Sequence, residues 1–261
     1  MRVLPAPCYL FSDAHLGIAP PTVERDVLDF LRSLRHRAGS LVINGDLFDF
    51  WFEWRHVIPR RAFRVLAALA DLREAGVRVV MIAGNHDCWG GEVLRREVGV
   101  EYRLGAWTGS LAGWRAHVEH GDGLRDVEDR GYRRWRTILR HPASIRAFRW
   151  LHPDWASALA RRTSDASRVR HDADEGAGLR IVATSLLAAT PDLQLVVYGH
   201  SHMAALERMP GGAVYANAGA WLIEPTYVVV NPDRISLRRW DGSPEGVELD
   251  GVERVAEKAL P

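Results

Sequence analysis

Five short blocks of polar residues, each at the end of a predicted strand, restrict the fold of this chain more than any other feature. Together they hold an unusually complete set of the oxygen and imidazole groups that bind metal ions in proteins. One such block would be weak evidence, because a single Asp-x-His or Gly-His-x-His arises by chance. All five in one chain require a fold that brings them together. The blocks are Asp13-Ala14-His15, Gly45-Asp46, Gly84-Asn85-His86-Asp87, His120-Gly121-Asp122 and Gly199-His200-Ser201-His202.

Four apolar runs in front of these blocks are typical of strands that are buried on both faces. Between the first three runs, apolar residues recur at helical spacing. This alternation indicates β-α-β units, in which the loops that follow the strands meet at one edge of the sheet. The runs are Cys8 to Phe11, Leu41 to Ile43, Val77 to Ile82 and Leu195 to Tyr198, and the helical positions are Val27, Phe30, Leu31 and Leu34, then Phe63, Leu66, Ala67 and Ala70.

Alternating patterns in the middle and last parts of the chain predict a second sheet. They run from Trp114 to Val118, and from Ala213 through Val230 to Leu237. We therefore expect an α/β fold of four layers, an αββα sandwich in which two sheets pack face to face between helices. A chain of 261 residues is long enough for one such domain with an insertion.

The segment from 124 to 170 departs from this pattern and predicts a helical cap, inserted into a core domain made of residues 1–123 and 171–261. Residues 125 to 170 hold twelve Arg against five acidic residues, an excess that favours an anionic partner. Pro142 and Pro153 separate three stretches of helical spacing that are rich in Trp. A solvated helix face stays open as an alternative, since Lys258 is the only lysine and Arg is used throughout.

The composition of the chain says more about its cellular compartment than about its binding partner. The chain has two cysteines, Cys8 and Cys88, which favours a reducing environment over a disulfide framework. The start of the chain is too short and too rich in proline for a signal peptide, and no apolar run approaches the ~18 residues of a spanning helix. We expect a cytoplasmic protein, with contact to a membrane surface left open. A net charge of +1 gives little support to nucleic-acid binding.

Seven side chains in the blocks are candidate metal ligands, more than one tetrahedral ion needs. Shared through a bridging carboxylate, they suit two ions about 4 Å apart. Oxygen and imidazole donors without thiolate favour manganese, with iron or zinc as alternatives. The candidates are Asp13, His15, Asp46, Asn85, His120, His200 and His202.

The charge of such a centre predicts phosphate chemistry. Two divalent ions outweigh the two carboxylates, Asp13 and Asp46, so the site should attract and polarise a phosphate and supply a hydroxide nucleophile near neutral pH. His86 follows a candidate ligand and need not bind metal itself. It is placed to donate a proton to a leaving oxygen or to stabilise charge on the phosphoryl group. We therefore take Asp46 and His86 as the catalytic candidates.

In their order and over nearly the whole chain, the five blocks resemble the calcineurin-like metallophosphoesterase superfamily. The resemblance implies that one metal is held by Asp13, His15, Asp46 and His202. It implies that the other is held by Asp46, Asn85, His120 and His200.

A narrower resemblance, to UDP-2,3-diacylglucosamine hydrolases of lipid A biosynthesis, comes from residues 45–51 and from the cap. It is strongest at Gly131-Tyr132, at Leu151-His152-Pro153-Asp154-Trp155 and from Ser164 to Arg168. It implies cleavage of UDP-2,3-diacylglucosamine to UMP and 2,3-diacylglucosamine 1-phosphate, with acyl chains held by the cap. Well-known members carry Arg where this chain has His86, a departure that bears on the substrate. Candidate substrate contacts are Asn85, His86, Asp129, Ser164, Arg168 and His200.

Other functions stay open at this level. A phosphodiesterase or phosphatase for other nucleotides or lipid diphosphates would use the same ligands, and a binding scaffold would be free to lose some of them. For Asp49, orienting a metal ligand and stabilising its loop are equally good interpretations. We expect Asp87 and Asp122 to form hydrogen bonds within their loops and Asn217 to shape a turn near the site. The oligomeric state does not follow from the sequence.

Overall fold

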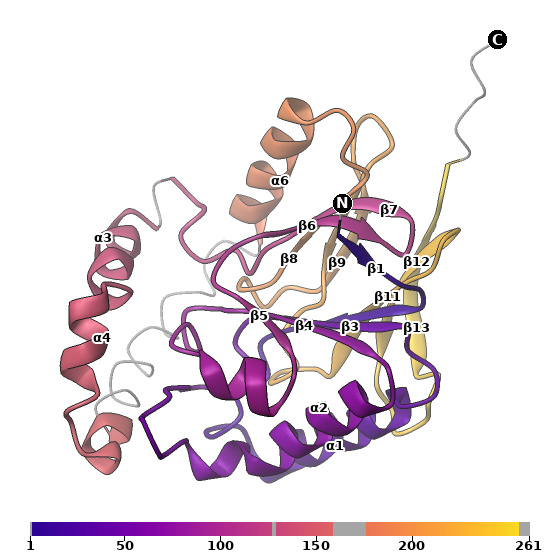
Figure 1. Ribbon diagram of the computed structural model, residues 1–261. Helices are drawn as coiled ribbons and strands as arrows, with labels where there is room; N and C mark the ends of the chain where they lie inside the picture. Colours follow the sequence, from indigo (N-terminus) through magenta and orange to yellow (C-terminus); the bar gives the residue numbers. More distant parts are fainter. Residues whose placement is uncertain (1, 127–128, 159–175, 256–261) are drawn as a thin grey trace.

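The computed structural model describes residues 2–126, 129–158 and 176–255, which form two stacked β-sheets with helices on their outer faces (Figure 1). The larger sheet has seven strands in the order β13-β12-β11-β2-β3-β4-β5. Strands β2 to β5 are parallel, whereas β11, β12 and β13 add an antiparallel edge. The bounds are β2 Cys8–Phe11, β3 Ser40–Asn44, β4 Arg78–Ile82, β5 Glu101–Arg103, β11 Thr226–Val230, β12 Arg234–Arg239 and β13 Val247–Glu253.

The second sheet has six strands in the order β1-β6-β7-β8-β10-β9. The parallel strands β7 and β8 of this sheet carry two of the polar blocks. Val118 lies opposite Val197, and the strands end shortly before His120 and His200. The bounds are β1 Val3–Leu4, β6 Trp107–Leu111, β7 Trp114–Val118, β8 Leu195–Tyr198, β9 Ala205–Arg208 and β10 Val214–Asn217.

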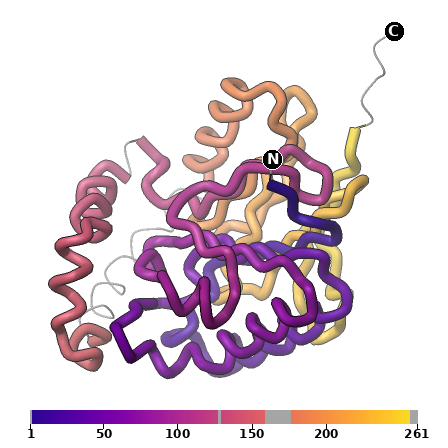
Figure 2. The backbone as a smooth tube through the Cα atoms, viewed as in Figure 1, coloured from indigo at the N-terminus to yellow at the C-terminus, as the bar shows by residue number. Residues whose placement is uncertain are grey.

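Alternation along the central strands divides the core into layers, because successive side chains of a strand point to opposite faces. In β2, Tyr9 and Phe11 pack with the helices α1 (Pro21–Leu34) and α2 (Phe63–Glu74), whereas Cys8 and Leu10 pack against the other sheet. Helix α6 (Ala177–Ala189) covers the outer face of the six-stranded sheet through Leu179. The chain path in Figure 2 follows the same order of layers. The predicted αββα sandwich is confirmed.

A smaller group of helices stands off the body of the fold on the left of Figure 1. It contains α3 (Arg130–Leu139), α4 (Pro142–Phe148) and a helical turn at 153–158. These segments fall within the predicted cap, and α4 and the helical turn begin at Pro142 and Pro153, the two prolines expected to separate its helices. Two short elements, η1 (Arg60–Ala62) and η2 (Val93–Glu97), lie in the body of the fold.

Aromatic side chains join the cap to the core. Phe148 of α4 lies 4.8 Å from the ring of Phe52 and stacks on Trp89 at 6.4 Å between centroids. Trp54 and Ala156 complete the buried part of this cluster. None of the helices in the described ranges is long and apolar enough to cross a membrane.

We predict that Phe30→Ala lowers the free energy of unfolding by about 3–5 kcal/mol, because it empties a fully enclosed site between α1 and the larger sheet. The ring of Phe30 packs against four other aromatic rings, with 4.8 to 5.8 Å between ring centroids. These are the rings of Phe11, Trp221, Tyr227 and Trp240. Urea denaturation followed by circular dichroism measures the change. The matched control is Phe63→Ala, because Phe63 is 70% exposed and should change stability by less than ~0.5 kcal/mol. Equal effects of the two substitutions would contradict the packing described here.

Candidate metal centre

The five polar blocks meet at the carboxyl ends of β2, β3, β4, β7 and β8. In the larger sheet, Phe11 pairs with Ile43 and Ile43 with Met81, so the loops that follow these strands start at the same level. The other two blocks come from the six-stranded sheet and approach across the interface, where the backbone N–H of His200 donates to Asp13 Oδ2 at 3.3 Å. The site is therefore built from both sheets.

Two compact groups of predicted ligand atoms form at this junction, and a third lies beside them, in which His15 is joined by Asp49 and His86. Asp13, His15 and His202 make one group, and Asp46, His120 and His200 make the other, with the ligand atoms of each group within 4.8 Å of one another. Asp46 Oδ2 lies 3.4 Å from His120 Nε2 and 4.0 Å from His15 Nε2, so it faces both groups. This is the position that a bridging carboxylate needs.

The backbone is strained where these side chains are presented. Of the six described non-glycine residues with positive φ, five are predicted ligands. Such a backbone conformation costs free energy for a residue with a Cβ and is found mainly where function holds it in place. The five are Asp13, His15, Asp46, His200 and His202, with φ values of 55°, 44°, 52°, 61° and 60°.

Glycines in the blocks allow the ligands to approach the neighbouring loops. A Cβ at Gly45 would lie 2.2 Å from His120 Nδ1, and one at Gly84 would lie 2.0 Å from Asp46 Oδ1. Both distances are far below a van der Waals contact, so the two positions exclude any side chain. The Gly-Asp and Gly-Asn patterns of the sequence thus have a steric cause.

Several buried ligand atoms lack a hydrogen-bond partner within the described part of the chain. They are Asp13 Oδ1, His15 Nε2, Asn85 Oδ1 and His120 Nε2. Buried polar atoms are normally paired, because leaving them unpaired is costly. Ligands about 2.1 Å from a tetrahedral ion are about 3.4 Å apart, which is the separation of Asp46 from His120 and of Asp13 from His202. These residues fit bound cations.

Electrostatics keep the central carboxylate charged. Burial alone would raise the pKa of Asp46, but His120 and His86 outweigh it and hold that pKa well below its usual value. Burial lowers the pKa of His15 to about 4, which keeps its imidazole neutral and able to bind metal. Burial also disfavours charge on His120, yet Asp46 raises its pKa well above the usual value. The negative field that attracts a proton there attracts a metal cation equally.

His86 is held so that one ring nitrogen faces this centre. Its Nδ1 donates to the carbonyl oxygen of Asp49 at 2.9 Å, and its Nε2 lies 3.9 Å from Asp46 Oδ2. Asp49 Oδ1 lies 3.6 Å from His86 Nδ1 and 3.9 Å from His15 Nδ1. The Asp49 carboxylate thus faces two imidazoles, one of them the predicted ligand His15, in agreement with the first interpretation that the sequence left open. The loop-stabilising role stays a prediction.

Two further polar residues, Asp87 and Asn217, hold the loops that carry the ligands. Asp87 accepts hydrogen bonds from the backbone N–H groups of Gly84 and Leu47, at 2.8 and 2.9 Å. Asn217 donates to the carbonyl oxygen of Gly199 at 3.0 Å and accepts from the N–H of Gly219. The bond of Asp87 to Gly84 and the turn at Asn217 confirm the loop roles expected from the sequence, whereas the bond to Leu47 also joins Asp87 to the loop after β3.

Asp122 has a broader role than its own loop. Its Oδ2 accepts a hydrogen bond from Tyr132 at 2.7 Å and another from Arg140 at 3.3 Å. Tyr132 belongs to α3 and Arg140 follows it, so the expectation of bonding within the loop was incomplete. Asp122 ties the cap to the loop that carries His120.

Sequence reasoning missed two supporting groups. The carbonyl oxygen of Asn44 accepts from His120 Nδ1 at 2.8 Å, which leaves Nε2 directed at the centre. Glu53 is buried and accepts from the backbone N–H groups of Gly91 and Val93, at 2.8 and 3.1 Å. The sequence did offer a signal for Glu53, because it is a single carboxylate within the aromatic run of residues 50–54. A buried charge in such a run requires hydrogen-bond partners.

The predicted cap contacts lie in different settings. Asp129 is buried and pairs with Arg125 through its side chain at 2.9 Å and through the backbone N–H of Arg125 at 2.9 Å. Its predicted role as a substrate contact stays a prediction. Ser164 and Arg168 lie outside the described residues.

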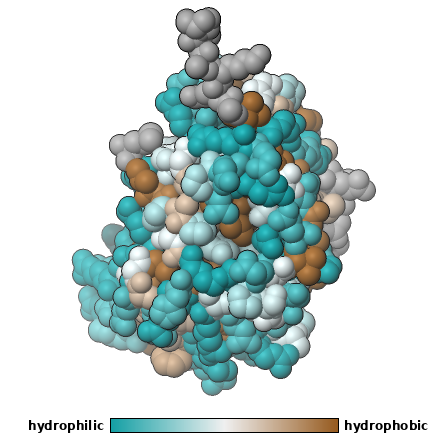
Figure 3. All heavy atoms as spheres, turned by 90° about the vertical axis from the view of Figure 1, so that its right-hand side faces the viewer, coloured by the Kyte–Doolittle hydropathy of each residue, from teal (hydrophilic) through white to brown (hydrophobic). Residues whose placement is uncertain are grey.

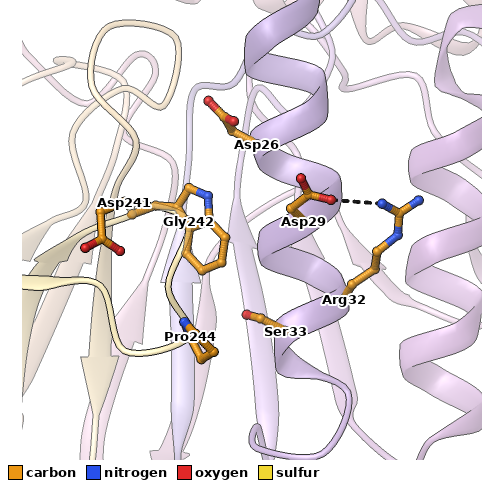
Figure 4. A pocket seen from close by; sticks show the side chains of 8 residues that line it. Asp26, Asp29, Arg32, Ser33, Asp241, Gly242 and Pro244 are labelled. Carbon is orange, nitrogen blue, oxygen red and sulfur yellow. Dashed lines mark hydrogen bonds and ion pairs between the residues drawn. The ribbon is translucent and has the colours of Figure 1, made fainter.

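A separate hollow of about 630 Å³ lies between α1 and the connection from β12 to β13 (Figure 4). Asp29 and Arg32, which line it, pair with each other at 2.9 Å. None of the predicted site residues lines this hollow. The chemistry expected from the sequence therefore belongs to the junction of the two sheets.

Comparison with known proteins agrees with this geometry. Chain residues 7–204 match the calcineurin-like phosphoesterase family. A UDP-2,3-diacylglucosamine hydrolase of Porphyromonas gingivalis is 29% identical over 90% of this chain and 94% of its own length. One from Pseudomonas syringae pv. syringae is also 29% identical, over 92% of this chain and 98% of its own.

A solved structure shares the fold. A dimetal phosphatase from Danio rerio superimposes with a TM-score of 0.53 at 14% identity, covering 97% of this chain and all of that one. At this identity the similarity concerns the fold alone. The family match spans the five polar blocks, from before Asp13 to His202. The chain is therefore a metal-dependent hydrolase that belongs to the calcineurin-like phosphoesterase family.

Proposed function

We propose that this enzyme hydrolyses the diphosphate of UDP-2,3-diacylglucosamine to UMP and 2,3-diacylglucosamine 1-phosphate. The observation that carries the phosphoester chemistry is the position of Asp46 between the two ligand groups. The names of the relatives and the aromatic cap support the lipid substrate. The proposal includes manganese as the metal and a peripheral location at the cytoplasmic face of the inner membrane.

The seven predicted ligands would hold two divalent ions, one at Asp13, His15 and His202 and one at Asn85, His120 and His200, with Asp46 shared. When bound, such ions supply positive charge for the phosphate oxygens and a nucleophile derived from water. The orphaned atoms Asp13 Oδ1, Asn85 Oδ1 and His120 Nε2 support this assignment. Hydrolysis adds water to one phosphorus of the diphosphate and breaks its bond to the bridging oxygen.

His86 is the residue of this chain that we propose to act on that bridging oxygen. Because its Nδ1 donates to the carbonyl of Asp49, Nε2 is the ring nitrogen that faces the metal centre, and we propose that it meets a substrate phosphate there. With a second proton at Nε2 the ring is an imidazolium, whose Nε2–H would stabilise negative charge on a phosphate oxygen and pass its proton to the leaving group. Imidazole is shorter than a guanidinium and makes one contact where Arg would make two. Its presence in place of Arg changes how the diphosphate is held.

The cap offers an apolar surface near the site. Its helix α3 exposes Trp135 and Ile138, at 63% and 55%, and Trp89 Nε1 bonds the carbonyl of Leu139 where α3 ends. Each acyl methylene removed from water contributes about 0.8 kcal/mol. A small soluble ester would gain little from such an apolar surface, whereas two acyl chains would be removed from water by it.

The direct test is incubation of the enzyme and manganese with UDP-2,3-diacylglucosamine, with UMP measured as the product. Release of UMP supports the proposal. Activity on a generic phosphodiester without release of UMP from the lipid would favour the alternative, a phosphoesterase of other nucleotide or lipid-diphosphate specificity.

We expect Asp46→Asn to lower the rate of UMP release by more than about 10²-fold, because the neutral amide cannot hold two cations as a shared carboxylate does. Metal content, measured by mass spectrometry after desalting, should fall in the same variant. The matched control is Asp71→Asn on the exposed side of α2, which should leave both quantities unchanged. Full metal content and a near-normal rate in Asp46→Asn would refute the shared role.

For His86→Ala we expect a loss of about 10²-fold or more with a poor leaving group. An aryl phosphodiester, whose leaving group needs little protonation, should lose much less if the ring acts as a proton donor. Equal losses with the two substrates would show charge stabilisation instead. The control is His36→Ala, because His36 is an exposed histidine that follows α1. If the His86 variant were as active as this control, His86 would take no part in the reaction.

Manganese should raise the melting temperature of the protein, because an ion that binds only the folded chain stabilises it by about 2.7 kcal/mol at a hundred times its Kd. Differential scanning calorimetry with and without a chelator measures the shift. Asp13→Asn should reduce the shift without abolishing folding. If the melting temperature of the unsubstituted protein were the same with manganese and with a chelator, the fit of these residues to cations would be contradicted.

A further inference from the structure

A second apolar surface lies beside the cap, on the turn that leads into α2. Val57 is 47% exposed and Phe63 is 70% exposed. Between and beneath them runs a groove of about 420 Å³, lined also by Ile58, Leu66 and Ala67. Single exposed apolar side chains are ordinary, whereas a groove with exposed apolar residues at its rim marks an interaction surface.

The surroundings of this groove are strongly basic. Residues 54–70 contain four Arg and one His and no acidic residue. Arg55, Arg60 and Arg64 are exposed and form no ion pair with other described residues, while Arg61 bonds the carbonyl oxygen of Gly17. Glu97 is the one acidic residue that lines the groove. An exposed Phe among unpaired Arg is complementary to an anionic surface that also accepts apolar groups.

The groove is continuous with the cap through Trp54. Trp54 lines the groove and also packs against Phe148 and Ala156 of the cap. Beyond these buried contacts the cap exposes Trp150 and Trp155, at 88% and 74%. Tryptophan is enriched where a protein meets the headgroup layer of a membrane. We name Val57, Phe63, Arg60, Arg64 and the groove between them the α2 patch.

The opposite side of the molecule has a different character. Figure 3 shows the face away from the cap, which is predominantly hydrophilic with scattered hydrophobic residues. In β13, Val247 and Leu249 are 40% and 44% exposed, but Glu248, Asp250 and Glu253 accompany them in the strand. The exposed apolar residues of β13 are thus accompanied by acidic side chains, whereas those of the α2 patch are accompanied by arginines.

We propose that the α2 patch docks on the surface of a bilayer that contains anionic phospholipid, with Val57 and Phe63 inserted among the headgroups and Arg60 and Arg64 facing lipid phosphates. Such binding depends jointly on buried apolar area and on basic charge. Docking there brings the neighbouring cap to the membrane that holds a diacylated substrate. The inference extends the proposed function, but it concerns a surface outside the metal centre.

The test measures sedimentation of the full chain with vesicles rich in phosphatidylglycerol, without substrate. Val57→Ser/Phe63→Ser should lower the vesicle partition coefficient at least about tenfold, because two apolar side chains no longer leave water. The control is Val247→Ser/Leu249→Ser in β13, which also replaces two exposed apolar residues, at 40% and 44% exposure, and it should bind like the unsubstituted protein. Vesicles of pure phosphatidylcholine should bind all these proteins weakly.

The electrostatic part is tested separately by Arg64→Glu, against Arg35→Glu at the end of α1, which changes the net charge equally. Reversal at Arg64 should reduce partitioning about tenfold and weaken its salt dependence, whereas reversal at Arg35 should change it by less than about twofold. Equal effects of the two reversals would show that overall charge, and not the α2 patch, governs binding.

Unchanged vesicle binding by Val57→Ser/Phe63→Ser would overturn the proposal. If sedimentation velocity also showed that the unsubstituted chain is a dimer and that this variant is a monomer, the patch would be assigned to contact with a second copy. Hydrolysis of detergent-dispersed substrate should be the same for variant and parent. Absence of that hydrolysis from both would refute the proposed function and leave the vesicle result standing.

Discussion

The position of the Asp46 carboxylate is the constraint on which the rest of the site depends. Its Oδ2 lies 3.4 to 4.0 Å from ring nitrogens of His15, His86 and His120, and its Oδ1 accepts the backbone N–H of His86 at 2.9 Å. A buried carboxylate in this setting is stable only with positive charge nearby. The glycine at 84, the positive φ of Asp46 itself and the support of the loop by Asp87 all serve to hold it there.

Much of this arrangement could be predicted from the sequence because it follows from periodicity. Parallel strands buried on both faces give unbroken apolar runs, as in Cys8 to Phe11, and the residue that follows each run must emerge at the same edge of the sheet. The αββα layers and the convergence of the five blocks were predictable for that reason. The chemistry of the site followed from the identity of the converging groups, since Asp, Asn and His without Cys suit divalent cations at a phosphate.

What could not be predicted depends on side chains that approach from distant parts of the chain. No local pattern indicates that Asp49 faces both His15 and His86, or that Asp122 binds Tyr132 and Arg140 and so ties the cap to a metal-ligand loop. The strained backbone at His200 and His202 is likewise imposed by tertiary packing. The α2 patch was not predicted because Phe63 fits the apolar stripe of a helix, and only its 70% exposure in the fold, against 6% for Leu66, separates the two residues.

The measurement that tests the central claim most directly is anomalous X-ray diffraction from crystals grown with manganese. Two anomalous peaks about 4 Å apart, with Asp46 in contact with both, are the result expected for a shared carboxylate. One peak at Asp13, His15 and His202 alone would contradict the dinuclear centre, and so would two peaks at the ligand groups with Asp46 bound to neither.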